Sequence, residues 1–116
     1  MAGQRHYEEV LPISRELAEL ALRTGDEHAR IDALLRLAYH DTDWTWVQDQ
    51  CLRYLDDPNA GVRGMAALCL GHLARIHRRL DVDRVLPILH GLESDPQIGW
   101  RVQDALDDIE VFLGRR

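Results

Sequence analysis

Six histidines and a group of aspartates near the C-terminus are the residues of this chain best suited to chemistry. A metal site on one helix usually takes two histidines four residues apart, so that both rings lie on the same face. His72 and His77 are five residues apart and therefore point to different faces of a helix. The other histidines come from separate predicted elements: His6, His28, His40 and His90. The sequence thus predicts no metal site.

The carboxylates of Asp104, Asp107 and Asp108 could act as acid and base if an apolar cleft shifted their pKa values. Nothing in the sequence indicates such a cleft. Ser14 and Ser94 have no histidine in a pattern typical of a nucleophilic serine, and the chain has no GxSxG, P-loop or GxGxxG motif. We therefore predict no catalytic residue, no cofactor and no enzymatic activity.

Composition narrows the possible partners. The chain has 116 residues, which suits one domain over 1–116, and its net charge of −6 argues against a surface built for nucleic acid. It lacks an apolar run of about 18 residues that could span a membrane. The stretch 1–6 also lacks the apolar character of a secretory signal, so we expect a cytoplasmic location. Cys51 and Cys69 fall at apolar helical positions and are expected to be reduced core residues.

Asp-Pro turns divide the chain into helices. Asp57-Pro58 and Asp95-Pro96 each place a capping carboxylate before a proline that fits the first turn of a helix. Six helices are predicted, at about residues 6–23, 26–40, 43–55, 57–78, 81–93 and 95–113. Short connections make consecutive helices antiparallel and group them into hairpins at about 6–40, 43–78 and 81–113. Pro12 and Pro87 fall inside predicted helices and should bend them.

Apolar residues at spacings of three and four define the buried face of the longer helices. The predicted core positions are Val47, Cys51, Tyr54 and Leu55 in the third helix, Val62, Met65, Ala66, Cys69, Leu73 and Ile76 in the fourth, and Val102, Ala105, Leu106, Ile109 and Phe112 in the sixth. Trp44 lies near the buried side of the third helix, whereas Trp46 is expected to point outward.

The fourth helix has a second face made only of small residues: Gly64, Ala67, Gly71 and Ala74. Glycine lowers the stability of a helix by up to about 1 kcal/mol, so such a face needs a compensating contact. We expect another backbone to approach closely there. It would belong either to a helix of the neighbouring hairpin or to a partner that uses a flat seat.

The motifs of the middle hairpin resemble those of HEAT repeats. They are Asp57-Pro58, Val62-Arg63, Ala66-Ala67 and Leu70-Gly71, and a proline in the first helix of the outer two hairpins adds to the resemblance. The short-repeat subfamily first associated with phycobilisome lyases is the most similar, although the third hairpin departs from its pattern at Trp100-Arg101 and Asp104-Ala105. The resemblance implies an all-α fold, an α-solenoid of three stacked antiparallel hairpins. First helices would line its convex side and second helices its concave side.

The concave side would gather the candidate partner-binding residues. They are Asp32, Arg36, Tyr39, His40, Arg75, Trp100, Asp104, Asp107 and Asp108. Trp100 could anchor an interface, or it could fold over the loop near Pro96, and the aspartates could be an ordinary solvated face. Trp46 would lie on a different surface, so that one partner would not reach both tryptophans.

Charge is distributed unevenly along the chain. Residues 41–60 hold five acids and one arginine, whereas residues 61–80 hold four arginines and no acid. We expect pairing across hairpins, for example between Arg63 and a capping aspartate. Exposed pairs are worth at most about 1 kcal/mol each, so they do not explain the excess of acid. A net acidic surface suits a basic partner, whose association it would accelerate.

Short acidic helical-repeat chains resemble the immunity proteins that bacteria encode beside secreted toxins, including contact-dependent inhibition and Rhs-type systems. This resemblance implies a non-catalytic module that neutralises a basic toxin, such as a nuclease, by direct binding. A tetrapyrrole lyase- or isomerase-like accessory protein and a scaffold subunit are the alternatives. The chain is expected to act as a monomer or weak homodimer, with neither nucleic acid nor membrane as its partner.

Overall fold

The computed structural model describes residues 9–116. Its elements are α1 (Arg15–Thr24), α2 (Glu27–His40), α3 (Trp44–Tyr54), α4 (Ala60–His72), a π-helical turn η1 (Leu73–His77), α5 (Val82–His90) and α6 (Gly99–Leu113). Within 9–116 there is no strand, so the all-α prediction is confirmed. No helix in this part of the chain is long and apolar enough to cross a membrane.

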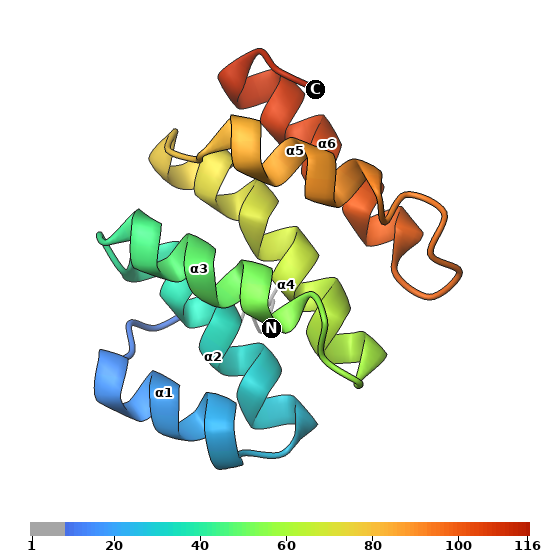
Figure 1. The fold of residues 1–116 in the computed structure, drawn as a ribbon. Coiled ribbons are helices and arrows are strands. Elements are labelled where there is room, and N and C mark those ends of the chain that lie inside the picture. The colour runs from blue at the N-terminus through green and yellow to red at the C-terminus, as the bar shows by residue number, and fades with distance from the viewer. Residues whose placement is uncertain (1–8) are drawn as a thin grey trace, which may run out of the picture.

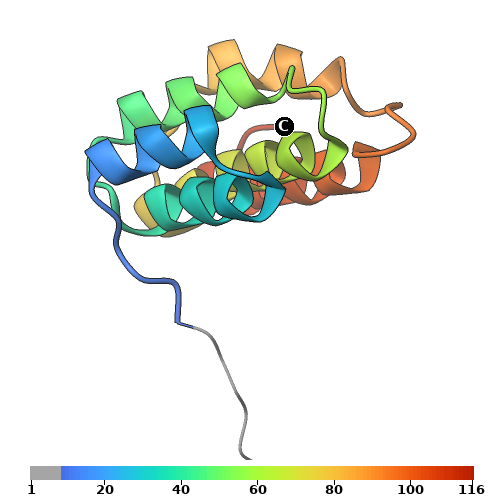
Figure 2. The same ribbon diagram turned by 90° about the horizontal axis from the view of Figure 1, so that it is seen from below.

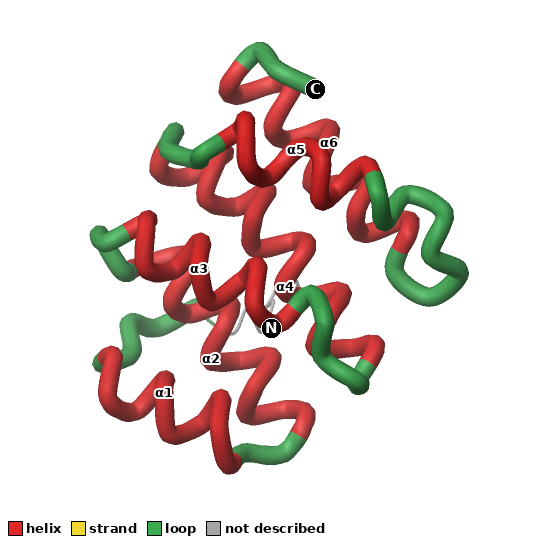
Figure 3. The backbone as a smooth tube through the Cα atoms, in the orientation of Figure 1, coloured by secondary structure: helices red, strands yellow, loops and turns green. Residues whose placement is uncertain are grey.

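The helices form two layers. Figure 1 shows three hairpins stacked in chain order, and Figure 2 shows α1, α3 and α5 in one layer and α2, α4 and α6 in the other. This is the predicted α-solenoid arrangement. We call α2, α4 and α6 the inner layer, and α1, α3 and α5 the outer layer. The connections are short except between α5 and α6, where a loop projects from the stack (Figure 3).

The first helix begins later than the sequence predicts. Ser14 is its N-cap, and the Ser14 hydroxyl accepts a hydrogen bond from the amide of Leu17. Pro12 therefore precedes α1 and bends no helix, so the prediction of a helix is wrong for residues 9–14; residues 6–8 lie outside the described part. Pro87 does lie inside α5, as predicted.

Side-chain caps define most other helix starts. Asp26 caps α2 and Asp43 caps α3, at the residues where the sequence predicts these helices to begin. Asn59 rather than Asp57 caps α4, because the Asn59 side chain accepts from the amide of Val62. Asp95 accepts from two amides in the turn just before α6, at 2.8 and 3.1 Å. It thus shapes the approach to α6 instead of capping its first residue.

One apolar core runs through all three hairpins. The predicted inward residues of α3, α4 and α6 are buried, except that Tyr54, Met65, Ile76 and Phe112 are half-buried. Cys51 and Cys69 are free thiols inside this core, as predicted. The core also includes residues from α2, among them Leu34 and Leu37, which are fully buried. The hairpins therefore share their buried surface, as stacked repeats must.

The small residues of α4 bring the inner helices close together. A Cβ atom on Gly71 would lie 3.0 Å from the Cα of Ala105 in α6, which is a steric conflict with backbone. Ala67 and Ala74 are fully buried. The neighbouring-helix interpretation of this face is confirmed, and a partner seat on it is wrong. In the outer layer the backbones of α1 and α3, and of α3 and α5, lie farther apart than those of α4 and α6.

A half-buried ion pair joins the first and second hairpins. Arg30 on α2 donates to the carboxylate of Asp57, and the two side chains are only 19% and 9% exposed. Burial opposes ionisation of Asp57, but hydrogen bonds from Arg30 and the Asn59 amide outweigh it and lower the Asp57 pKa. Arg63, predicted to pair with a capping aspartate, instead donates to the side chain of Gln97 at 2.7 Å and to the carbonyl of Asp57 at 3.1 Å.

Candidate functional site

We call the solvent-facing side of the inner layer the inner face. Three side chains meet there, between α2 and the end of α4. The guanidinium of Arg75, in the π-helical turn, donates to Nδ1 of His72 at 2.9 Å and to the hydroxyl of Tyr39 at 3.4 Å. The rings of Tyr39 and His72 meet edge to face with centroids 5.3 Å apart. Burial and the charge of Arg75 lower the pKa of His72 to about 4, so this imidazole is neutral at pH 7. The group is a polar link between α2 and the end of α4.

Helix α6 places three carboxylates on the inner face. Asp107 accepts hydrogen bonds from Arg116 at 2.8 Å and Gln103 at 3.4 Å, which lower its pKa. Asp108 is half-buried; burial raises its pKa, its neighbours Asp104 and Asp107 add to the rise, and Arg75 opposes it. Asp104 is exposed and has no hydrogen-bond or ion-pair partner within 9–116. Negative charge on this helix is therefore only partly compensated.

Trp100 lies at the beginning of α6 and is 60% exposed. The guanidinium of the next residue, Arg101, lies 4.4 Å from the centre of its ring. Most of the indole is therefore open to a partner. Packing of its other side on the loop near Pro96 stays a prediction. Along the helix axis Trp100 is about 12 Å from Asp108, so a partner that contacts both must cover about two helical turns.

The candidates on α2 are engaged by their own chain. Arg36 donates to the carbonyls of Leu11 at 2.9 Å and Pro12 at 2.7 Å. His40 lies in hydrogen-bonding contact with the carbonyl of Val10. Arg36 also pairs with Asp32 at 3.3 Å, one helical turn away. These side chains fasten the segment before α1 to the inner layer, which is a structural task.

The predicted site residues therefore fall into separate groups. Tyr39 and Arg75 meet at the centre, and Asp108 is close enough for Arg75 to affect its pKa. Asp104, Asp107 and Trp100 follow on α6, whereas Arg36 and His40 are occupied with the N-terminal segment. His72, the acceptor for Arg75, is not among the residues predicted from the sequence. The spacing of three between them, on one helical face, was the available signal.

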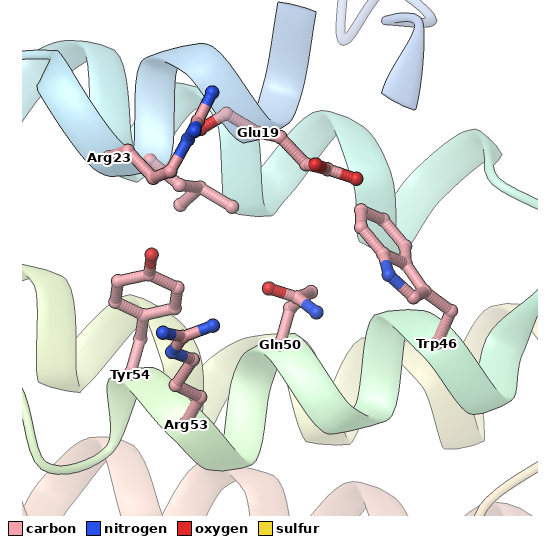
Figure 4. A pocket seen from close by; sticks show the side chains of 7 residues that line it. Glu19, Arg23, Trp46, Gln50, Arg53 and Tyr54 are labelled. Atoms are coloured by element: carbon pink, nitrogen blue, oxygen red, sulfur yellow. The ribbon is translucent and has the colours of Figure 1, made fainter. Parts of the chain in front are cut away.

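Trp46 does not point into solvent as predicted. It is half-buried and forms one wall of a pocket of about 240 Å³ between α1 and α3. Its ring lies under the guanidinium of Arg15, at 4.1 Å. Figure 4 shows Glu19 and Arg23 of α1 on one side of this pocket, opposite the α3 side chains, which include Gln50. Trp46 and Trp100 thus lie in different layers, as expected.

The chemistry available on the inner face is that of recognition. It offers an exposed tryptophan and an arginine, which are residue types enriched at protein interfaces. Its carboxylates can pair with basic groups of a partner. Among residues 9–116, no group of three or more His, Cys, Asp or Glu side chains is placed to hold a metal ion.

Residues 47–77, which span most of α3, α4 and the π-helical turn, match the HEAT repeat family. No curated protein sequence matches significantly. A chain in the crystal structure of a CDI complex from Cupriavidus taiwanensis LMG 19424 is similar, with a TM-score of 0.83 and 34% identity. The match covers 94% of the chain described here and 96% of that chain.

Proposed function

This chain belongs to the same family of HEAT-repeat proteins as the matched chain of the CDI complex, and we propose that it is an immunity protein that binds a toxin and neutralises it. CDI denotes contact-dependent inhibition. The observation that carries the proposal is the match itself, which extends over nearly the full length of both chains at 34% identity. Such a match makes a shared type of partner a reasonable inference, whereas the fold alone would not.

The proposed action needs no catalysis by this chain. An immunity protein can act by covering the active site or substrate-binding surface of its toxin. The acidic composition supports a basic partner, since opposite charges accelerate association and disfavour wrong partners. We propose that the chain does this in the cytoplasm, as a monomer or weak homodimer, and that it binds protein rather than nucleic acid.

The toxin-binding surface that we propose consists of the solvent-facing side of α6 and the adjoining group of Tyr39 and Arg75. Trp100 would be the aromatic anchor, and Asp104, Asp107 and Asp108 would face basic groups of the toxin. Tyr39 and Arg75 would border this surface. Arg36, His40 and Asp32 are left out, because the first two already hold the N-terminal segment and the third pairs with Arg36.

A neutralisation assay tests the function. The toxin domain encoded beside this gene is expressed in bacteria with and without this protein, and growth and co-purification are measured. Growth arrest by the toxin alone, rescue by this protein and a stable one-to-one complex are expected. Growth arrest by this protein itself would instead identify it as the toxin chain of such a pair. Absence of both rescue and complex would overturn the proposal.

Charge reversal tests the surface. The double variant Asp104→Arg and Asp107→Arg should weaken toxin binding by about a hundredfold or more, because attractive contacts become repulsive. The control, Glu16→Arg with Asp56→Arg, changes net charge equally, but at exposed positions on α1 and in the α3–α4 turn. It should change the Kd by less than about threefold at physiological salt. Equal losses in both double variants would mean that net charge, and not this surface, drives binding.

A further inference from the structure

A second pocket lies where the ends of four elements meet. It has a volume of about 440 Å³ and is bordered by the start of α3, the turn between η1 and α5, the start of α5 and the end of α6. Its apolar side chains are Trp44, Leu80, Val82 and Leu113, all half-buried although they pack against the core. Four apolar side chains thus keep part of their surface open to solvent in one hollow.

Three arginines surround this apolar floor: Arg78, Arg79 and Arg115. Arg115 pairs with Asp83 at 2.8 Å, but both side chains are more than half exposed, so water competes for that contact. Arg79 has no hydrogen-bond or ion-pair partner in the part of the chain that the structure describes. The pocket therefore concentrates positive charge in a protein whose net charge is −6.

The backbone beside the pocket is held in an unusual conformation. Helix α4 ends in the π-helical turn, and Arg78 follows with a φ of 55° in the left-handed region. It is the one non-glycine residue with positive φ within 9–116. Its guanidinium lies 4.7 Å from the ring of Phe112, and its Nε donates to the carbonyl of Arg75 at 3.2 Å. Arg78 is thus held at the pocket edge in a backbone conformation that residues other than glycine rarely adopt.

We propose that this pocket, the arginine pocket, binds an acidic peptide segment of a protein partner. An aromatic or aliphatic side chain of the segment would lie on the apolar floor beside Trp44. Flanking carboxylates would accept hydrogen bonds from Arg78, Arg79 and Arg115, which present planar donors suited to carboxylates. The volume is enough for one or two large side chains. Binding would remove the exposed apolar surface of the floor from water, which stabilises the complex.

The distribution of charge favours a peptide over a single small anion. The arginines come from two separate segments, 78–79 and the C-terminal end of the chain, and border an apolar floor instead of converging on one point. Several carboxylates spaced along a chain match that arrangement. The pocket is opposite in charge to the surface proposed for the toxin. Its ligand can be tested whether or not the immunity function holds.

Fluorescence anisotropy with a labelled hexapeptide tests the proposal. The probe carries Leu-Phe flanked by two acidic residues on each side, and a matched peptide carries Ser-Ser in place of Leu-Phe. The full-length protein should bind the first peptide at least tenfold more tightly than the second. Binding should weaken as salt rises, because exposed charges contribute to it.

Two double variants locate the site. Arg79→Gln with Arg115→Gln should reduce affinity for the Leu-Phe peptide about tenfold or more, since two charged donors are lost. Arg23→Gln with Arg53→Gln removes the same charge from the pocket between α1 and α3 and should leave affinity unchanged. The proposal would be overturned if both double variants lost peptide affinity equally, or if the first one bound the Leu-Phe peptide as tightly as the unmodified protein. Equal affinity for the Leu-Phe and Ser-Ser peptides would also overturn it. So would tighter binding of a labelled oligothymidylate than of the peptide at the same salt concentration, which would indicate single-stranded nucleic acid.

Discussion

The inner and outer layers contain helices of the same repeats but pack in different ways. In the inner layer, glycine and alanine let α4 approach α6 until a single added carbon would meet backbone. In the outer layer, larger side chains such as Trp46 separate neighbouring helices and leave a pocket between α1 and α3. Stability therefore depends on tight contact in one layer, while the other tolerates open space. Variants that disturb contacts in one layer but not in the other test that difference.

Overpacking should be damaging only in the inner layer. Gly71→Leu would force α4 and α6 apart and should lower the free energy of unfolding by about 3 kcal/mol. Gln50→Leu, which adds apolar volume to the outer pocket, should change it by less than about 0.5 kcal/mol. Urea unfolding followed by circular dichroism measures both. Similar losses in the two variants would refute the proposed difference between layers.

Ion pairs between hairpins should differ in the same way. Asp57→Ala leaves the half-buried Arg30 without its carboxylate and should cost about 2.5 kcal/mol. Asp49→Ala breaks the exposed pair with Arg84, whose side chains are 54% and 53% exposed, and should cost less than about 1 kcal/mol. Thermal unfolding of the two variants provides the comparison. A larger loss for Asp49→Ala would place the main link between hairpins in the outer layer.

The two tryptophans should separate stability from binding. Trp46→Ala removes a half-buried ring and its stacking on Arg15, and should cost about 2 kcal/mol of stability. Trp100→Ala should change stability by less than about 0.5 kcal/mol but weaken toxin binding at least tenfold. Calorimetric unfolding and binding titrations with the toxin domain measure these effects. Normal toxin binding by Trp100→Ala would remove this residue from the proposed surface.

Two histidines should respond oppositely to acid. The pKa of His72 is about 4 when folded and near 6.5 when unfolded, so the unfolded chain binds a proton first and stability falls between pH 6.5 and 4. His72→Asn should remove about 1 kcal/mol of that loss, after allowance for solvent screening. A hydrogen bond to Glu93 raises the pKa of His90 in α5, so its contribution is present at low pH and is lost as pH rises through the folded pKa. Urea unfolding at pH 7, 6 and 5 measures the free energy of unfolding of each variant. Compared with the unmodified protein, His72→Asn should lose less stability as the pH falls, and the control His90→Asn should lose more.

Much of the fold could be predicted because its signals are local. Apolar spacing identified the buried faces of α3, α4 and α6, and the row of small residues in α4 indicated a close helix neighbour. The sequence predicts too early a start for α1, because Val10, Leu11 and Ile13 extend its apolar pattern toward the N-terminus. The helix is in fact capped by Ser14, which follows them. Asp57 and Asn59 flank Pro58, and either could have capped α4.

The candidate site was harder to predict because its residues depend on distant contacts. Arg36 donates to the carbonyls of Pro12 and Leu11, which lie 24 and 25 residues earlier in the chain. A local pattern cannot show these hydrogen bonds. The sequence of α4 contains no known signal for the π-helical turn that aims Arg75 at Tyr39. The pattern of α3 alone predicts a solvent-exposed Trp46, because it carries no information about α1, which faces this side chain across the pocket. Contacts between segments far apart in the sequence decided the positions of Arg36, Arg75 and Trp46.

The attachment of the segment before α1 has a consequence for how this family can diverge. Arg36 and His40 hold that segment by its backbone carbonyls, a group that every amino acid carries. Val10 and Leu11 are therefore free to change identity over evolutionary time without loss of the attachment. Related sequences should therefore vary at positions 10 and 11 but retain the arginine at position 36 and the histidine at position 40.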